Sequence, residues 1–152
     1  MKKFSLFFLS LFILVGANAQ FDDSSDNWDT MADVKYVKSQ DEYGEIYVPE
    51  FGDEVKKMEG ELVTLKGYIV PFEGMFKPEQ IILSSLPIAS CFFCGGSGPE
   101  TVAEIHFQNT ITYSDKPVSV RGKLKLNNTD YDQLMYVLTD AEYYSEKNKR
   151  WE

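Results

Sequence analysis

The stretch Leu62-Val63-Thr64-Leu65-Lys66-Gly67-Tyr68-Ile69 decides the fold, because its side chains alternate with a period of two. One face carries Val63, Leu65, Gly67 and Ile69, and the other carries the polar or amphipathic residues between them. Strict alternation of this kind predicts a half-buried β-strand. A glycine inside such a strand predicts a bend or a close approach of another backbone.

Four further segments predict strands that accompany the first one. Residues 117–126 alternate most regularly, and they again carry a glycine, Gly122, in the middle of the segment. The other three segments are residues 80–84, 101–107 and 134–140, although the last one also fits a buried helix. Five short strands, two of them bent by glycine, predict a mainly β fold: a small five-stranded OB-like barrel, closed or partly open.

The region before the barrel predicts shorter elements. Trp28 opens an amphipathic segment that runs to Val34, and we expect its indole to plug one end of the core. Residues 43–49 alternate as an edge strand that Pro49 ends. Residues 52–58 predict a short helix. The fold prediction therefore adds a short N-terminal helical segment to the barrel.

The first 19 residues have the pattern of a secretory signal peptide. Lys2 and Lys3 precede an apolar run, and Ala17-Asn18-Ala19 matches an A-x-A cleavage site. We therefore predict four regions and an exported protein, periplasmic or secreted, in a compartment where disulfides persist. The regions are a signal peptide (1–19), a flexible segment (20–27), a single barrel domain (28–144) and a charged tail (145–152). The apolar run is short for a membrane span, so none is expected after cleavage.

The charge of the chain restricts its partners. The formal net charge is −9, and losing the signal peptide removes two lysines and no acidic residue, which makes it −11. A chain this acidic repels polyanions, so nucleic acid is not an expected partner. No dinucleotide, P-loop, zinc-protease or serine-hydrolase motif occurs, and His106 is the single histidine. We therefore predict a protein that is not an enzyme, with no catalytic residue to name.

The loop Cys91-Phe92-Phe93-Cys94-Gly95-Gly96-Ser97-Gly98 carries the most distinctive chemistry of the sequence. Two thiols at this spacing can close a disulfide, bind a soft metal or cycle between the two redox states. A disulfide across so short a loop stabilises a fold by only about 2 kcal/mol, which favours a use beyond stapling. A catalytic redox pair normally has a βαβ frame, and the flanking segments here predict strands.

A metal site is the most concrete of these hypotheses. Cys91 and Cys94 would supply thiolates, and His106 a third ligand. Glu104, on the same strand face as His106, or Glu100, in the loop, would supply a fourth ligand or support the others. This donor set suits zinc, and the thiol pair alone suits copper(I).

The alternative is a rigid recognition loop closed by a disulfide. Its ligand-binding residues would be Phe92, Phe93, Gly95, Gly96, Ser97 and Gly98. The glycines permit a tight turn, and the two phenylalanines would meet a peptide, glycan or protein. The same two rings could instead be plugs of the hydrophobic core.

The order of motifs resembles a family of small bacterial proteins of unknown function, exported as secreted proteins or lipoproteins. The resemblance rests on Trp28, on the strand and turn Leu62 to Glu73, and on the late strand Pro117 to Leu124, and it covers most of residues 28–142. It implies an OB-like barrel with a cysteine-containing loop and no catalytic residues. Relatives near genes for metal-uptake or export systems imply an accessory role, with a transport-system component as partner. Many relatives have a proline-rich loop where this chain has Cys94 to Pro99.

Overall fold

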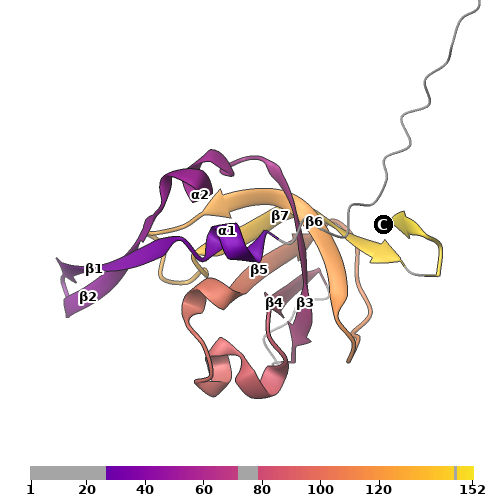
Figure 1. Cartoon of the computed structure of the whole chain (residues 1–152), viewed down its shortest axis with the longest axis horizontal. Helices are drawn as coiled ribbons and strands as arrows, with labels where there is room; N and C mark the ends of the chain where they lie inside the picture. Colours follow the sequence, from indigo (N-terminus) through magenta and orange to yellow (C-terminus); the bar gives the residue numbers. More distant parts are fainter. Residues whose placement is uncertain (1–26, 72–78, 146) are drawn as a thin grey trace, which may run out of the picture.

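A computed structural model describes residues 27–71, 79–145 and 147–152. The described chain is mainly β, with a closed five-stranded barrel and a few short helices, which confirms the predicted fold class (Figure 1). The predicted signal peptide, and the turn that the sequence predicts after Pro71, lie outside the described residues. No helix within the described ranges is both long and apolar enough to cross a bilayer.

Five strands form the barrel, and each one pairs with two others. Their order is β5-β4-β3-β6-β7, all antiparallel, and β5 pairs with β7 in parallel to close the ring. The last strand, predicted over residues 134–140, is confirmed, although it lies further toward the C-terminus, at Tyr136–Ser145. The strands are β3 (Leu62–Val70), β4 (Gln80–Ser84), β5 (Val102–Phe107), β6 (Val118–Leu126) and β7 (Tyr136–Ser145).

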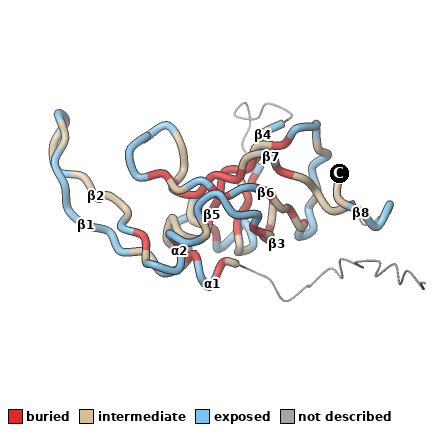
Figure 2. The backbone as a smooth tube through the Cα atoms, turned by 90° about the horizontal axis from the view of Figure 1, so that it is seen from above, coloured by how far each residue is buried: buried red, intermediate tan, exposed pale blue. Residues whose placement is uncertain are grey.

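The core fills the barrel with the side chains that the alternation predicts to face inward. In β3, Val63 and Leu65 are buried and Lys66 is exposed, and β6 repeats the pattern with buried Val120 and Leu124. Figure 2 shows the buried segments gathered at the centre of the molecule. Tyr136 is the largest fully buried side chain, and its hydroxyl donates to the carbonyl oxygen of Met31.

Two short helices cover the barrel. They are α1 (Trp28–Met31) and α2 (Asp53–Lys57). Trp28 is buried, and its indole N–H donates to the Lys66 carbonyl oxygen over 3.0 Å, so the predicted plug is confirmed. The ring of Phe51 lies 5.7 Å from that of Tyr136. These contacts fasten the N-terminal part of the chain to the barrel.

A two-stranded ribbon extends away from the barrel (Figures 1 and 2). Strands β1 (Val34–Asp41) and β2 (Gly44–Phe51) pair along their whole length. The Asp41 carboxylate accepts the amide of Gly44 in the turn, and Gly44 has φ +134°. The sequence predicts that Pro49 ends this strand, and that prediction is wrong: β2 continues to Phe51, because an edge strand tolerates a proline.

The remaining elements are short. Three single 3-10 turns, η1 (Ile88–Ser90), η2 (Phe92–Cys94) and η3 (Pro99–Thr101), build the connection between β4 and β5. In the charged tail, β8 (Arg150–Trp151) pairs with the end of β7. The cysteine loop is therefore ordered throughout, although it contains no strand.

Candidate functional site

The two cysteines lie side by side as free thiols. Their Sγ atoms are 3.9 Å apart, and the disulfide that the sequence allows is not formed. Cys91 is fully buried and Cys94 is exposed, so only one thiol meets solvent. The hydrogen bond with Cys91 raises the pKa of the Cys94 thiol. The exposed sulfur therefore lacks the lowered pKa that marks a reactive cysteine.

Each glycine of the loop has a local reason. Gly95 has φ +77°, which ends the 3-10 turn in the left-handed conformation that glycine adopts readily. Gly96 packs on the preceding turn so closely that a Cβ would lie 2.6 Å from the Ser90 carbonyl oxygen. A Cβ at Gly98 would lie 2.2 Å from a carboxylate oxygen of Glu100. The Thr101 hydroxyl donates to the Gly98 carbonyl oxygen over 2.7 Å, and the Ser97 hydroxyl bonds the same Thr101 oxygen. The loop is therefore a tightly folded unit.

The two phenylalanines are not core plugs, so that interpretation is wrong. Phe92 is half-buried, Phe93 is 40% exposed, and their rings meet edge to face at 5.2 Å. Phe92 lies between the two cysteines in sequence and faces a cleft at the base of the ribbon. The cysteine loop therefore presents an aromatic ring to the surface.

This cleft has a volume of about 260 Å³ and three walls. We call it the aromatic cleft, because four of its thirteen lining residues are aromatic. The ribbon forms the first wall, the cysteine loop the second, and the β6–β7 connection the third. The lining residues are Tyr36, Tyr47, Val48, Pro49, Phe92, Pro99, Asn127, Asn128, Asp130, Tyr131, Gln133, Leu134 and Met135.

Hydrogen bonds hold the three walls in place. The Tyr36 hydroxyl donates to Glu100 over 2.8 Å, which ties the ribbon to the cysteine loop, and it lies 3.6 Å from the Met135 sulfur. Burial and the bond to Glu100 raise the pKa of Tyr36, so the hydroxyl remains a donor. The buried amide of Asn127 donates to the carbonyl oxygens of Asp130, Gln133 and Leu134 and fixes the β6–β7 connection.

Glu104 and His106 share a face of β5, as the sequence predicts, and they bond each other over 2.7 Å. Glu104 is buried, and two further groups donate to it: Gln80 to its Oε1, and the Leu134 amide to its Oε2 over 3.3 Å. The carboxylate therefore supports a residue of the cleft wall. Both of its oxygens therefore already have hydrogen-bond partners within the protein.

The five residues of the predicted metal site do not come together. They form three separate contacts: the cysteine pair, Glu100 with Tyr36, and Glu104 with His106. Within the described ranges, no three side chains of His, Cys, Asp or Glu gather in a geometry that could hold a metal ion. Glu100 is instead hydrogen-bonded to Tyr36 of the ribbon, and Glu104 to His106 and Gln80.

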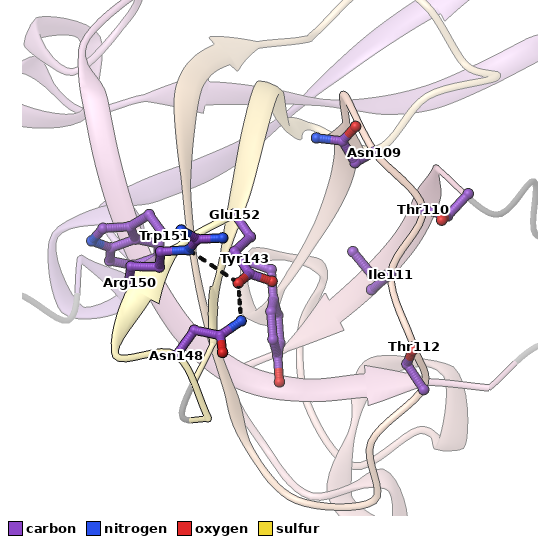
Figure 3. A pocket seen from close by; sticks show the side chains of 9 residues that line it. All are labelled: Asn109, Thr110, Ile111, Thr112, Tyr143, Asn148, Arg150, Trp151 and Glu152. Carbon is purple, nitrogen blue, oxygen red and sulfur yellow. Dashed lines mark hydrogen bonds and ion pairs between the residues drawn. The ribbon is translucent and has the colours of Figure 1, made fainter.

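A second, wider hollow lies near the C-terminal strand pair (Figure 3). Its volume is about 750 Å³, and Tyr143 and residues 109–112 form part of its lining. Asn148 and Arg150 both donate to the Glu152 carboxylate along one side of it. These polar groups already bond one another, so the aromatic cleft is the better candidate site.

Comparisons with known proteins leave the family of the chain open. No family model matches the sequence, and no curated protein matches it. Among solved structures, the chain resembles the crystal structure of a DUF3299 family protein from Pseudomonas aeruginosa PAO1. The identity is 18%, the TM-score is 0.41, and the match covers 60% of this chain and 66% of that one.

Proposed function

We propose that this protein is an exported, non-enzymatic accessory protein that binds a partner protein in the aromatic cleft. The observation that carries the proposal is the convergence of Tyr36, Phe92 and Tyr131 from three distant segments on one cleft. Aromatic side chains supply large contact areas at low cost in conformational entropy, and they dominate binding interfaces. Tyr131 is 70% exposed, so its ring is accessible to a partner.

The arrangement of the barrel supports the same reading by analogy. In OB folds, ligands meet one face of the barrel and the loop between the last two strands. We regard this barrel as OB-like, and its β6–β7 connection supplies the third wall of the cleft. The analogy concerns the position of the site only, because one fold supports many functions.

The cysteine pair fits a disulfide-closed recognition loop better than a metal centre or a redox catalyst. Tetrahedral zinc would separate two thiolates by about 3.8 Å, which the 3.9 Å spacing matches, but no third His, Cys, Asp or Glu ligand joins them among the residues that the structure describes. The raised pKa of Cys94 opposes both thiolate ligation and nucleophilic attack. In the oxidising compartment that the signal peptide predicts, the two sulfurs would close to a bond of about 2.05 Å.

The state of the thiols has a direct test in the intact mass. For protein recovered from the exported fraction without reductant, we expect a mass two hydrogens below that of the reduced chain. The variant with both Cys91→Ser and Cys94→Ser should show no such loss. Native mass spectrometry of the same sample should show no bound zinc or copper, and a retained metal that the double variant lacks would favour the metal hypothesis instead.

The binding role predicts that Tyr131 contacts the partner in the cell. A photo-crosslinking phenylalanine at position 131 should form a discrete adduct, and the same residue at Tyr113, which is 54% exposed and outside the cleft, should not. With the identified partner purified, Tyr131→Ala should weaken binding about tenfold, the loss typical of an aromatic interface anchor. Equal adducts from both positions, or an affinity unchanged by Tyr131→Ala, would contradict the proposal.

A further inference from the structure

We propose that the aromatic cleft binds an arginine or lysine side chain of an extended peptide segment in the partner. The inference rests on the proposed function and specifies the chemistry of its ligand. It follows from the charges around the cleft, from its aromatic walls, and from the ribbon beside it. Each of these features selects against a different alternative ligand.

The charges around the cleft favour a cation. Asp130 is the single charged residue among the thirteen that line it. A second carboxylate, that of Glu100 in the cysteine loop, accepts a hydrogen bond from the hydroxyl of Tyr36, which lines the cleft. Two lysines lie near the cleft: Lys38 is paired with the Glu45 carboxylate over 2.9 Å, and Lys125, which keeps its charge, donates to the Gln133 amide oxygen over 3.0 Å. An incoming cation therefore meets the Asp130 carboxylate and no basic residue among the lining side chains.

The aromatic walls favour a cation over a neutral polar group. Three tyrosines and one phenylalanine line the cleft, and the face of an aromatic ring attracts an ammonium or guanidinium group. One such contact already exists at this wall, where the ammonium nitrogen of Lys38 lies 5.8 Å from the centroid of the Tyr47 ring. The Tyr47 ring thus already meets a positive charge, and Tyr131, which is 70% exposed, is open to an incoming one.

The shape of the site favours a peptide over a free small molecule. A volume of about 260 Å³ lies just below the usual range for small-molecule pockets, roughly 300–1,000 Å³, and suits one inserted side chain. The ribbon beside it has two strands only, so no third strand covers either edge in the described part of the chain. An open edge can pair with the main chain of an extended peptide while one side chain enters the cleft.

The test selects peptides on the full mature chain. A phage-displayed library of random 12-residue peptides is panned against it, and the selected peptides are synthesised in matched pairs. One member of each pair has arginine replaced by citrulline, which keeps the shape and removes the charge, or lysine replaced by acetyl-lysine. We expect the selected peptides to carry a basic residue, and the neutral member to bind at least about tenfold more weakly.

Matched variants assign the effect to the cleft. Asp130→Asn should weaken the binding of the basic peptides several-fold, because it removes the negative charge. It keeps an oxygen that can accept the hydrogen bond from the Asp132 amide. Asp29→Asn, at an exposed acid on α1, should leave binding unchanged. Tyr131→Leu should weaken the binding of every selected peptide.

Three results would overturn the inference. If the selected peptides depend on Tyr131 but bind equally well without their charge, the cleft does not select a basic side chain, and the proposed function still stands. If free argininamide binds as tightly as the peptides, the ligand of the cleft is a small cation and not a peptide. If no selected peptide depends on Tyr131 for binding, the aromatic cleft is not the binding site, and the proposed function is contradicted as well.

Discussion

Replacing Tyr136 with alanine is expected to lower the free energy of unfolding by about 4 kcal/mol, within the range for aromatic truncation in a core. The side chain is fully buried, and its ring packs against Phe51 at the base of the ribbon. Its hydroxyl donates to the Met31 carbonyl oxygen in the first helix. The substitution thus opens a cavity at the junction of barrel, ribbon and helix. Urea denaturation followed by circular dichroism measures the loss.

Two further variants separate the ring from the hydroxyl. Tyr136→Phe keeps the packing and leaves the Met31 carbonyl oxygen without this donor, which should cost about 1–2 kcal/mol. Tyr113→Ala, at a ring that is 54% exposed, should change stability by less than about 0.5 kcal/mol. A loss below 1 kcal/mol for Tyr136→Ala would show that this junction does not hold the fold together.

The same tyrosine makes stability sensitive to alkaline pH. Burial raises the pKa of Tyr136, and the negative charges of Glu100 and Asp33 raise it further. An unfolded tyrosine ionises near pH 10, so above that pH the unfolded chain binds fewer protons than the folded one. Stability should therefore hold up to about pH 10 and fall as the pH rises further. The fall should be shallower in Tyr136→Phe, with a remainder from Tyr36, whose pKa is also raised by burial.

The strands were predictable because their signal is local. Alternation around Leu65 and Val120 shows which side chains face the core, and both segments form barrel strands as expected. The closure of the barrel is not local, since β5 pairs in parallel with β7 across the intervening β6. The ribbon was only partly predicted, because most of its residues are exposed on both faces and leave a weak pattern.

The site was less predictable than the fold. The cysteine loop stands out in any reading of the sequence, and Phe92 does line the cleft. Its neighbours there, Tyr36 and Tyr131, come from segments far away in sequence, so no spacing rule connects them with the loop. The only available signal was the number of tyrosines, nine in the whole chain, several of them in otherwise polar stretches. The hydrogen bonds of Glu100 to Tyr36 and of Glu104 to His106 could not be predicted from the sequence, and they were missing from the metal hypothesis.

Replacing Gly67 with alanine is expected to destabilise the barrel by about 3 kcal/mol, at the upper end for overpacking. Gly67 is the last residue of β3 that pairs with β6, and from Tyr68 onward the strand pairs with β4. A Cβ there would lie 2.2 Å from the carbonyl oxygen of the buried Ser84, a backbone atom that no side-chain rotation can move away. This glycine is where β3 turns the corner of the barrel, as the sequence predicts for a mid-strand glycine.

The sign of this effect is its strongest test. Alanine in place of glycine usually stabilises a protein by about 0.4–1 kcal/mol, because it restricts the unfolded chain, so steric contact must exceed that gain. Gly122→Ala is the matched control in the other bent strand, where the nearest carbonyl oxygen, that of Thr139, lies 2.9 Å from the added carbon. Its cost should be smaller, because the contact needs less movement to relieve. If urea denaturation found Gly67→Ala equal to or more stable than the parent chain, β3 and β4 would not approach each other this closely at the corner.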